Sequence, residues 1–238
     1  MRILITNDDS ISSPVLLPLA KWAQKLGEVT VVVPKVEQSG KSHGIELHKA
    51  FEVKKVDFDG IEAYTVDSTP ADCVRYAVLG MKRRFDLVLS GINKGLNIGL
   101  DVMYSGTAGA IFEAAALDIP AIALSTDPKS FDPALSQLDM VYDFFVKNEL
   151  MKKCSLYNVN FPLEFKGIRI TRQGGPFYSD DFEHIGNDMF MPVGKCVYED
   201  RGDFTLDTDA SLHGYVSISP MTIVRTNMKV FEELLSLT

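Results

Sequence analysis

Two adjacent carboxylates near the start of the chain are its most distinctive chemical feature. The apolar run Ile3-Leu4-Ile5 leads directly into Asn7, Asp8 and Asp9. Two like charges about 4 Å apart repel by roughly 4 kcal/mol at an effective dielectric constant of about 20. Folding tolerates that repulsion only if solvent, a proton or a cation relieves it. Mg²⁺ and Mn²⁺ take oxygen ligands, usually one or two carboxylates with phosphate and water, so the pair favours a divalent-metal site. Helix capping by one Asp and solvation of the other is the alternative.

A glycine-rich segment with two asparagines supplies a second polar cluster. Residues 90–99 read SGINKGLNIG and follow a β-rich apolar run. Glycines let main-chain N–H groups approach a ligand, and Asn93 and Asn97 offer neutral amide groups. The segment is neither the dinucleotide fingerprint G-x-G-x-x-G nor a Walker loop, because no G-K-[ST] follows. A plain loop with Asn in turns is the alternative.

A third cluster opens a helix of small residues. Ser105-Gly106-Thr107 follows Tyr104 and precedes an alanine-rich run. Free N–H groups and the helix dipole favour an anion at such a terminus, so we expect it to bind phosphate. An ordinary Ser N-cap is the alternative. Ser39-Gly40, judged by itself, is a turn, and the four histidines show no zinc-binding spacing.

The surrounding pattern predicts the elements that would bring these clusters together. We expect strands at 2–6, 29–33, 61–66, 85–89 and 120–125, an extended segment at 45–58, and helices at 14–26, 70–79, 106–117 and 133–150. Such alternation predicts an α/β fold, with a Rossmann-like parallel-sheet core and helices on both faces. Ligands of these sheets bind beyond the carboxyl ends of the strands. The residues after 2–6 and after 85–89 should therefore share one edge.

The second half of the chain has a different pattern. Short strands are expected at 156–161, 168–171 and 215–219, and a short amphipathic helix at 228–237. Residues 174–209 show no clear period and are interpreted as a mobile loop or a projecting hairpin. We therefore expect one domain over 1–238, with an α/β core at about 1–150 and a β-rich extension at 151–238.

Composition limits the partners. The 238 residues carry a net charge of −8, which argues against binding large nucleic acids because phosphate-backbone affinity comes from Lys and Arg. No apolar run is long enough to span a membrane. The three cysteines have no C-x-x-C spacing and indicate reduced thiols. With a strand beginning at once and no room for a signal peptide, these features favour a cytoplasmic protein.

Taken together, the motifs resemble one family, the SurE survival proteins, over nearly the whole chain. The matching segments are Asn7-Asp8-Asp9, Ser39-Gly40, 69–74 (TPADCV), 90–93 (SGIN), Asp101 with 104–107 (YSGT), 158–162 (NVNFP) and 214–220 (GYVSISP). The match is weakest across 174–209. The family usually has Gly where this chain has Ser10 and Ser68, and neither change removes a proposed ligand.

The resemblance implies both a function and a site. Family members are metal-dependent nucleoside monophosphate phosphatases, so one divalent ion, Mg²⁺ or Mn²⁺, is expected per subunit. Its implied ligands are Asp8, Asp9, Ser39 and Asn93, and the implied phosphate contacts are Asn97, Ser105, Gly106 and Thr107. The resemblance also implies a homodimer or homotetramer formed through the C-terminal part.

The mechanism expected from these residues is hydrolysis of 5′-nucleotides, and of 3′-nucleotides as a further class, by water activated at the metal. Asp8 and Asp9 are the expected catalytic residues, with Asp9 doubling as a base. One alternative is a phosphatase with a covalent aspartyl-phosphate, for which Lys94 is the only nearby lysine candidate. The other is a non-catalytic module that binds a nucleotide or sugar nucleotide without metal.

Overall fold

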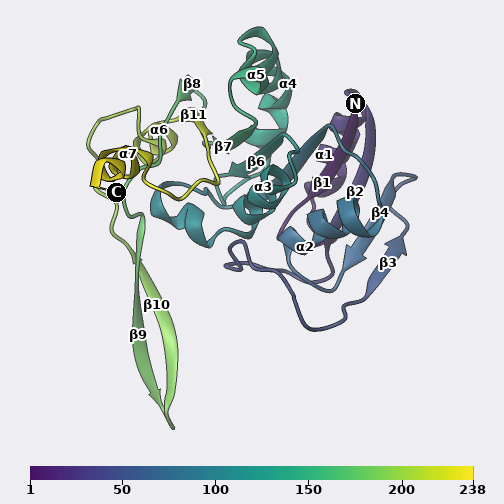
Figure 1. Ribbon diagram of the computed structural model, residues 1–238, viewed down its shortest axis with the longest axis horizontal. Helices are drawn as coiled ribbons and strands as arrows, with labels where there is room; N and C mark the ends of the chain where they lie inside the picture. Colours follow the sequence, from purple (N-terminus) through teal and green to yellow (C-terminus); the bar gives the residue numbers. More distant parts are fainter. Residues whose placement is uncertain (238) are drawn as a thin grey trace.

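The computed structural model describes residues 1–237 and is built around one large sheet with helices on both faces (Figure 1). The strand order in this sheet is β3-β4-β2-β1-β5-β6-β7-β11-β8. Neighbouring strands run parallel except for the pairs β3–β4 and β7–β11. Its strands are β1 (Arg2–Thr6), β2 (Glu28–Pro34), β3 (Val53–Val56), β4 (Glu62–Val66), β5 (Leu87–Lys94), β6 (Ala121–Thr126), β7 (Leu156–Phe161), β8 (Gly167–Ile170) and β11 (Tyr215–Pro220).

Continuous apolar strands force the sheet to be covered on both faces. Ile3 and Ile5 of β1 point into one core cluster and Leu4 points into the other, because side chains alternate along a strand. Helices α1 (Leu16–Gln24) and α4 (Asp132–Lys147) pack on the first face. Helices α2 (Pro70–Arg75) and α3 (Gly106–Ala116) pack on the second. The expected α/β architecture is confirmed.

Several boundaries differ from expectation. Helix α2 ends at Arg75 and passes into a π-helical turn at Tyr76–Gly80, and only Val53–Val56 of the extended segment at 45–58 is a strand. Strand β5 continues to Lys94, where a loop from residue 90 was expected. Its pairing with β6 shifts register between Ser90 and Asn93 and then resumes, so an irregularity hides the second half of the strand from pattern analysis. A 3₁₀ helix at Gly99–Tyr104 then leads into α3.

Some of the residues after 150 add strands to the main sheet, and others form a separate hairpin. Strands β7, β8 and β11 join the main sheet, with the short helices α5 (Leu150–Lys153) and α6 (Asp207–Leu212) beside them. Strands β9 (Tyr178–Gly186) and β10 (Met189–Cys196) form an antiparallel hairpin that projects from the rest of the chain (Figure 1). Asn187 and Asp188 both have positive φ at its tip, as a tight two-residue hairpin turn requires. Of the two expectations for 174–209, the projecting hairpin is confirmed.

The end of the described chain is the exposed helix α7 (Met228–Leu234), followed by a 3₁₀ turn at Leu235–Leu237, and α7 buries none of its residues. None of the helices within residues 1–237 is long and apolar enough to cross a membrane. Cys73, Cys154 and Cys196 are free cysteines.

Candidate functional site

Adjacent parallel strands bring the predicted residues to one edge of the sheet. Strand β1 pairs with β5 from Ile3–Leu87 to Thr6–Ser90, so the residues following each strand lie side by side. An open cavity of about 450 Å³ lies at this edge. Among the residues that line it are Asp8, Asp9, Ser39, Asn93, Asn97 and Ser105. The structure therefore gathers six of the eight predicted site residues around one cavity, and the other two, Gly106 and Thr107, contact Asp8.

Asp8 is a carboxylate held almost out of solvent. Its residue is 5% exposed, and its Oδ1 accepts a hydrogen bond of 2.7 Å from the hydroxyl of Thr107. Burial raises the pKa of Asp8 to about 6, the Thr107 bond opposes this rise, and the neighbouring charge of Asp9 adds to it. A divalent cation beside Asp8 would reverse the penalty, because an opposite charge favours the ionised form.

Asp9 presents an oxygen that has no protein partner. Its Oδ2 is buried and makes no hydrogen bond within the described residues. Burial raises the pKa of Asp9, while a hydrogen bond from the main chain of Lys94 opposes the rise. The Oδ1 atom of Asn7 is likewise buried without a partner. Buried oxygens without hydrogen-bond donors are costly unless an ion or water satisfies them, so these atoms fit a hard cation.

The two side chains that were predicted to be neutral metal ligands keep oxygen lone pairs free. The side-chain nitrogen of Asn93 donates to the main-chain oxygen of Gly95 at 2.8 Å, which leaves Oδ1 as a free acceptor. The hydroxyl of Ser39 donates to Glu37 at 2.6 Å, so its oxygen can still coordinate. No three His, Cys, Asp or Glu side chains within residues 1–237 form a metal-binding group. A cation here would therefore depend on the oxygens of Ser39 and Asn93 to complete its ligands.

The start of α3 closes the other side of Asp8. Ser105 is the N-cap, with its oxygen accepting from the N–H of Ala108 at 3.0 Å, so the capping interpretation of this residue is correct. Its hydroxyl hydrogen is still available to donate to an anion. A Cβ on Gly106 would lie 3.2 Å from the Cβ of Asp8, which explains why a small residue begins this helix. Thr107 is fully buried and directs its hydroxyl at Asp8.

Asn97 is held by a clamp of side chains from β6 and β7. The carboxamide of Asn160 pairs with its main chain, accepting from the Asn97 N–H at 2.8 Å and donating to its carbonyl at 3.0 Å. Asn158 donates to the same carbonyl at 2.8 Å. The side-chain nitrogen of Asn97 donates to the hydroxyl of Ser125 at 2.8 Å. Its amide oxygen and the second hydrogen of its side-chain nitrogen are left for a ligand.

Sequence reasoning missed these supporting roles. Asn158 and Asn160 alternate within a buried apolar strand, and that i, i+2 pattern of polar residues on one face was the available signal. Asp101 and Tyr104, which also line the cavity, belong to a matched motif but had no assigned role. Glu37 lines the cavity as well, and no motif marked it.

Comparisons with known proteins agree with this geometry. The family model described as "Survival protein SurE" matches residues 3–180. The chain is 38% identical to the 5′-nucleotidase SurE of Alkaliphilus metalliredigens, covering 100% of this chain and 98% of that protein. It is 36% identical to the 5′-nucleotidase SurE of Petrotoga mobilis, covering 99% and 98% of the two chains.

A solved structure is similar over the same extent. The crystal structure of the SurE protein from Aquifex aeolicus superimposes with a TM-score of 0.78 at 33% identity, covering 100% of this chain and 99% of that one. Family model, full-length relatives and fold all agree, and the chain belongs to the SurE family of survival proteins.

Proposed function

We propose that this protein is a divalent-metal-dependent phosphomonoesterase that hydrolyses nucleoside 5′-monophosphates, and 3′-monophosphates as a second class. The observation that carries the proposal is the buried, unpartnered Oδ2 of Asp9 beside the desolvated carboxyl of Asp8. Full-length relatives named 5′-nucleotidase SurE support the substrate class. The two carboxylates would repel a phosphate dianion unless a cation neutralises them.

Each residue has a defined task in this proposal. Asp8, Asp9, Ser39 and Asn93 would hold Mg²⁺ or Mn²⁺. When bound, such an ion supplies Lewis-acid chemistry that polarises a phosphate oxygen and makes nearby water more acidic. Thr107 keeps Asp8 in place through its hydrogen bond.

The phosphate would lie against the start of α3. There the free N–H groups of the first turn, the Ser105 hydroxyl and the helix dipole stabilise negative charge. Asp9 would take a proton from the attacking water as the P–O ester bond breaks, and would return that proton to the leaving nucleoside oxygen.

The test is release of orthophosphate from 5′-AMP and 3′-AMP by the full chain. We expect no turnover after treatment with a chelator, recovery with Mn²⁺ or Mg²⁺, and loss of at least about a hundredfold in kcat for Asp8→Asn and Asn93→Ala. Near wild-type turnover in either variant would refute the site. Trapping of a phosphoenzyme would instead support the aspartyl-phosphate alternative, and nucleotide binding without metal or hydrolysis would support a binding module.

We further propose that the protein is a homodimer or homotetramer that works in a reducing compartment such as the cytoplasm. The projecting hairpin exposes Phe182 and Phe190, which are 65% and 60% exposed, and α7 exposes Phe231 at 46%. Exposed aromatic side chains of this kind are typical of interaction sites. The three free cysteines support the compartment. Light scattering after size-exclusion chromatography measures the assembly, and a monomer at all concentrations would contradict it.

A further inference from the structure

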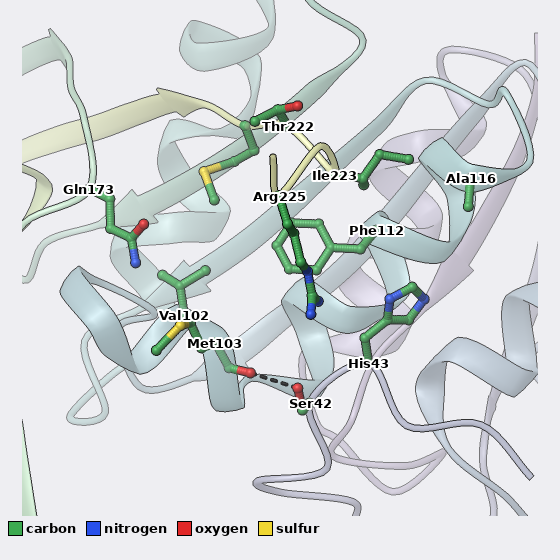
Figure 2. Close-up of a pocket in the computed structure, with 11 residues that line it drawn as sticks. Ser42, His43, Val102, Met103, Phe112, Ala116, Gln173, Thr222, Ile223 and Arg225 are labelled. Atoms are coloured by element: carbon green, nitrogen blue, oxygen red, sulfur yellow. Dashed lines mark hydrogen bonds between the residues drawn. The ribbon is translucent and has the colours of Figure 1, made fainter. Parts of the chain in front are cut away.

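The cavity that Asp8 and Asp9 line is called the acidic cavity below. A second cavity, of about 560 Å³, is lined by other residues (Figure 2). Its apolar part includes Phe112 and Met103, and its polar part includes His43, Gln173 and Arg225. The volume lies within the range of about 300–1,000 Å³ typical of small-molecule sites, and a mainly apolar lining with a few convergent polar groups is also typical of them. No residue that lines this cavity also lines the acidic one.

Hydrogen bonds of Ser42 lie between the two cavities. The Ser42 hydroxyl donates to the carbonyl of Met103 at 2.6 Å, and the Ser42 N–H donates to the carbonyl of Tyr104 at 3.0 Å (Figure 2). Ser42 packs tightly on α3, because a Cβ on Gly109 would lie only 2.1 Å from the oxygen of Ser42. A ligand confined to the second cavity would contact none of the residues that line the first.

The second cavity carries an uncompensated positive charge. Arg225 makes no hydrogen bond or ion pair within the part of the chain described, and its side chain extends across the cavity in front of Phe112 (Figure 2). Two buried acids nearby, Asp72 and Glu113, share Arg75 as an ion-pair partner. Glu113 bonds to His43 at 2.7 Å and to Arg75 at 3.3 Å, and its pKa is lowered by these partners, that of His43 first. The exposed guanidinium of Arg225, which neither of these acids pairs with, is therefore available to an anionic group of a ligand.

The apolar part of the cavity favours a planar ring. Phe112, Val102 and Met103 line the cavity together with Arg225 (Figure 2). Aromatic and thioether side chains bind flat rings by stacking and by sulfur–aromatic contact. The imidazole of His43 lies with its centroid 6.2 Å from that of Phe112, and its bond to Glu113 fixes its orientation. A ligand would therefore combine a planar ring with a negatively charged group.

We propose that this cavity is a second ligand site, which binds a nucleotide-sized organic anion with its ring against Phe112 and its anionic group at Arg225. The site is independent of the acidic cavity and of any hydrolysis there. Arg225 would donate a charge-assisted hydrogen bond to the anionic group, because its guanidinium has no partner among the described residues.

The experiment is calorimetric titration of the full-length protein with 3′,5′-cyclic AMP, a phosphodiester that a phosphomonoesterase does not consume. We expect Arg225→Gln to weaken binding by about tenfold or more. Ala116→Trp should abolish binding, because Ala116 is an exposed residue on the cavity lining and the indole would fill the space. The control Arg84→Gln changes an exposed arginine just before β5, at the opposite end of the strand from the cavities. This control should bind as wild type does.

A fourth variant separates the two sites. Asp8→Asn should retain binding of 3′,5′-cyclic AMP, because the second cavity does not use Asp8. Loss of binding in Asp8→Asn, equal binding by Arg225→Gln and wild type, or no binding by wild type up to millimolar ligand would each overturn the proposal. Since binding is the readout, failure of the protein to hydrolyse AMP would leave this result interpretable.

Discussion

The burial of Asp8 should make the free energy of unfolding of the metal-free protein depend on pH. In the unfolded chain its pKa has the ordinary value of 3.8, whereas burial raises it to about 6 in the folded chain. The folded chain therefore holds more protons than the unfolded chain between these pH values. Its free energy of unfolding must fall as the pH rises through this window, unless a cation binds.

Replacing Asp8 by Asn should therefore stabilise the metal-free protein. The amide can still accept the hydrogen bond from Thr107 and carries no charge to desolvate. In the presence of a chelator, urea unfolding at about pH 8 should show a gain of about 1–3 kcal/mol in the free energy of unfolding, which shrinks towards about pH 4.5. The same variant should lose the stabilisation that Mn²⁺ gives to wild type. An unchanged or lower stability at about pH 8 would show that desolvation is not the dominant effect.

Asn160 is expected to position Asn97. Asn160→Leu nearly preserves volume but leaves the buried N–H of Asn97 without its acceptor, at a cost of about 1–3 kcal/mol. Displacement of Asn97 should also reduce kcat/KM for AMP by about tenfold to a hundredfold. The control Asn148→Leu removes a side-chain bond to Phe144 at the end of α4 and should lower stability alone. If both variants retain full activity, the clamp has no role in the reaction.

At the scale of single residues, the sequence predicted which side chains line the cavity better than it predicted their hydrogen-bond partners. The placement of Asp8 and Asn93 at one edge of the sheet was predictable because each follows a recognisable apolar run, although Asn93 was proposed as a ligand only through family resemblance. The Ser125 and Asn160 contacts were not, because they depend on the side-by-side placement of β6 and β7, which local pattern does not encode. Ser39 was assigned only through family resemblance, since Ser-Gly alone indicates a turn.

Among the elements, β5 places Asn93 at the site by means of an irregularity in its pairing with β6. Gly91 has φ +133°, and a Cβ there would lie 2.2 Å from the carbonyl oxygen of Leu124. The register shift at this point lets β5 resume pairing with β6 at Asn93, opposite Ser125. The helix and strand types were predictable from apolar periodicity, but the second half of β5 was not, because glycines normally indicate loops.

Gly91→Ala should therefore cost far more stability than alanine at a neighbouring glycine. Gly95 has a similar φ of +127°, but the nearest atom to a Cβ placed there would be the side-chain nitrogen of Asn93 at 3.7 Å. Gly95→Ala should lower the free energy of unfolding by about 1 kcal/mol through backbone strain alone. Gly91→Ala adds a steric clash and should cost about 3 kcal/mol or more. Equal losses in chemical denaturation would mean that the close approach to β6 is unimportant.

At the scale of the whole molecule, the β9–β10 hairpin stands out because none of its residues is buried within the described chain. One face of the β9–β10 ribbon carries Tyr178, Phe182 and Phe190, because register pairs Phe182 with Pro192 and Phe190 with His184. The sequence allowed either a mobile loop or a hairpin here. The sequence pattern could not distinguish them, because neither face of the ribbon is buried and no alternation of apolar and polar residues is therefore required.

A double substitution Phe182→Glu and Phe190→Glu should dissociate the proposed oligomer, because charge on an apolar contact surface opposes association. The matched control Leu79→Glu places the same charge on a residue that is 52% exposed, at the end of the π-helical turn. Light scattering should report a smaller mass for the double variant only. An unchanged mass would assign the interface to another surface, such as α7.

The most direct test of the metal site is an anomalous difference map from crystals of the wild-type protein soaked in Mn²⁺. The account predicts one strong peak per subunit, bounded by oxygens of Asp8, Asp9, Ser39 and Asn93. A map without a peak there, while both carboxylates remain in the positions described, would contradict it.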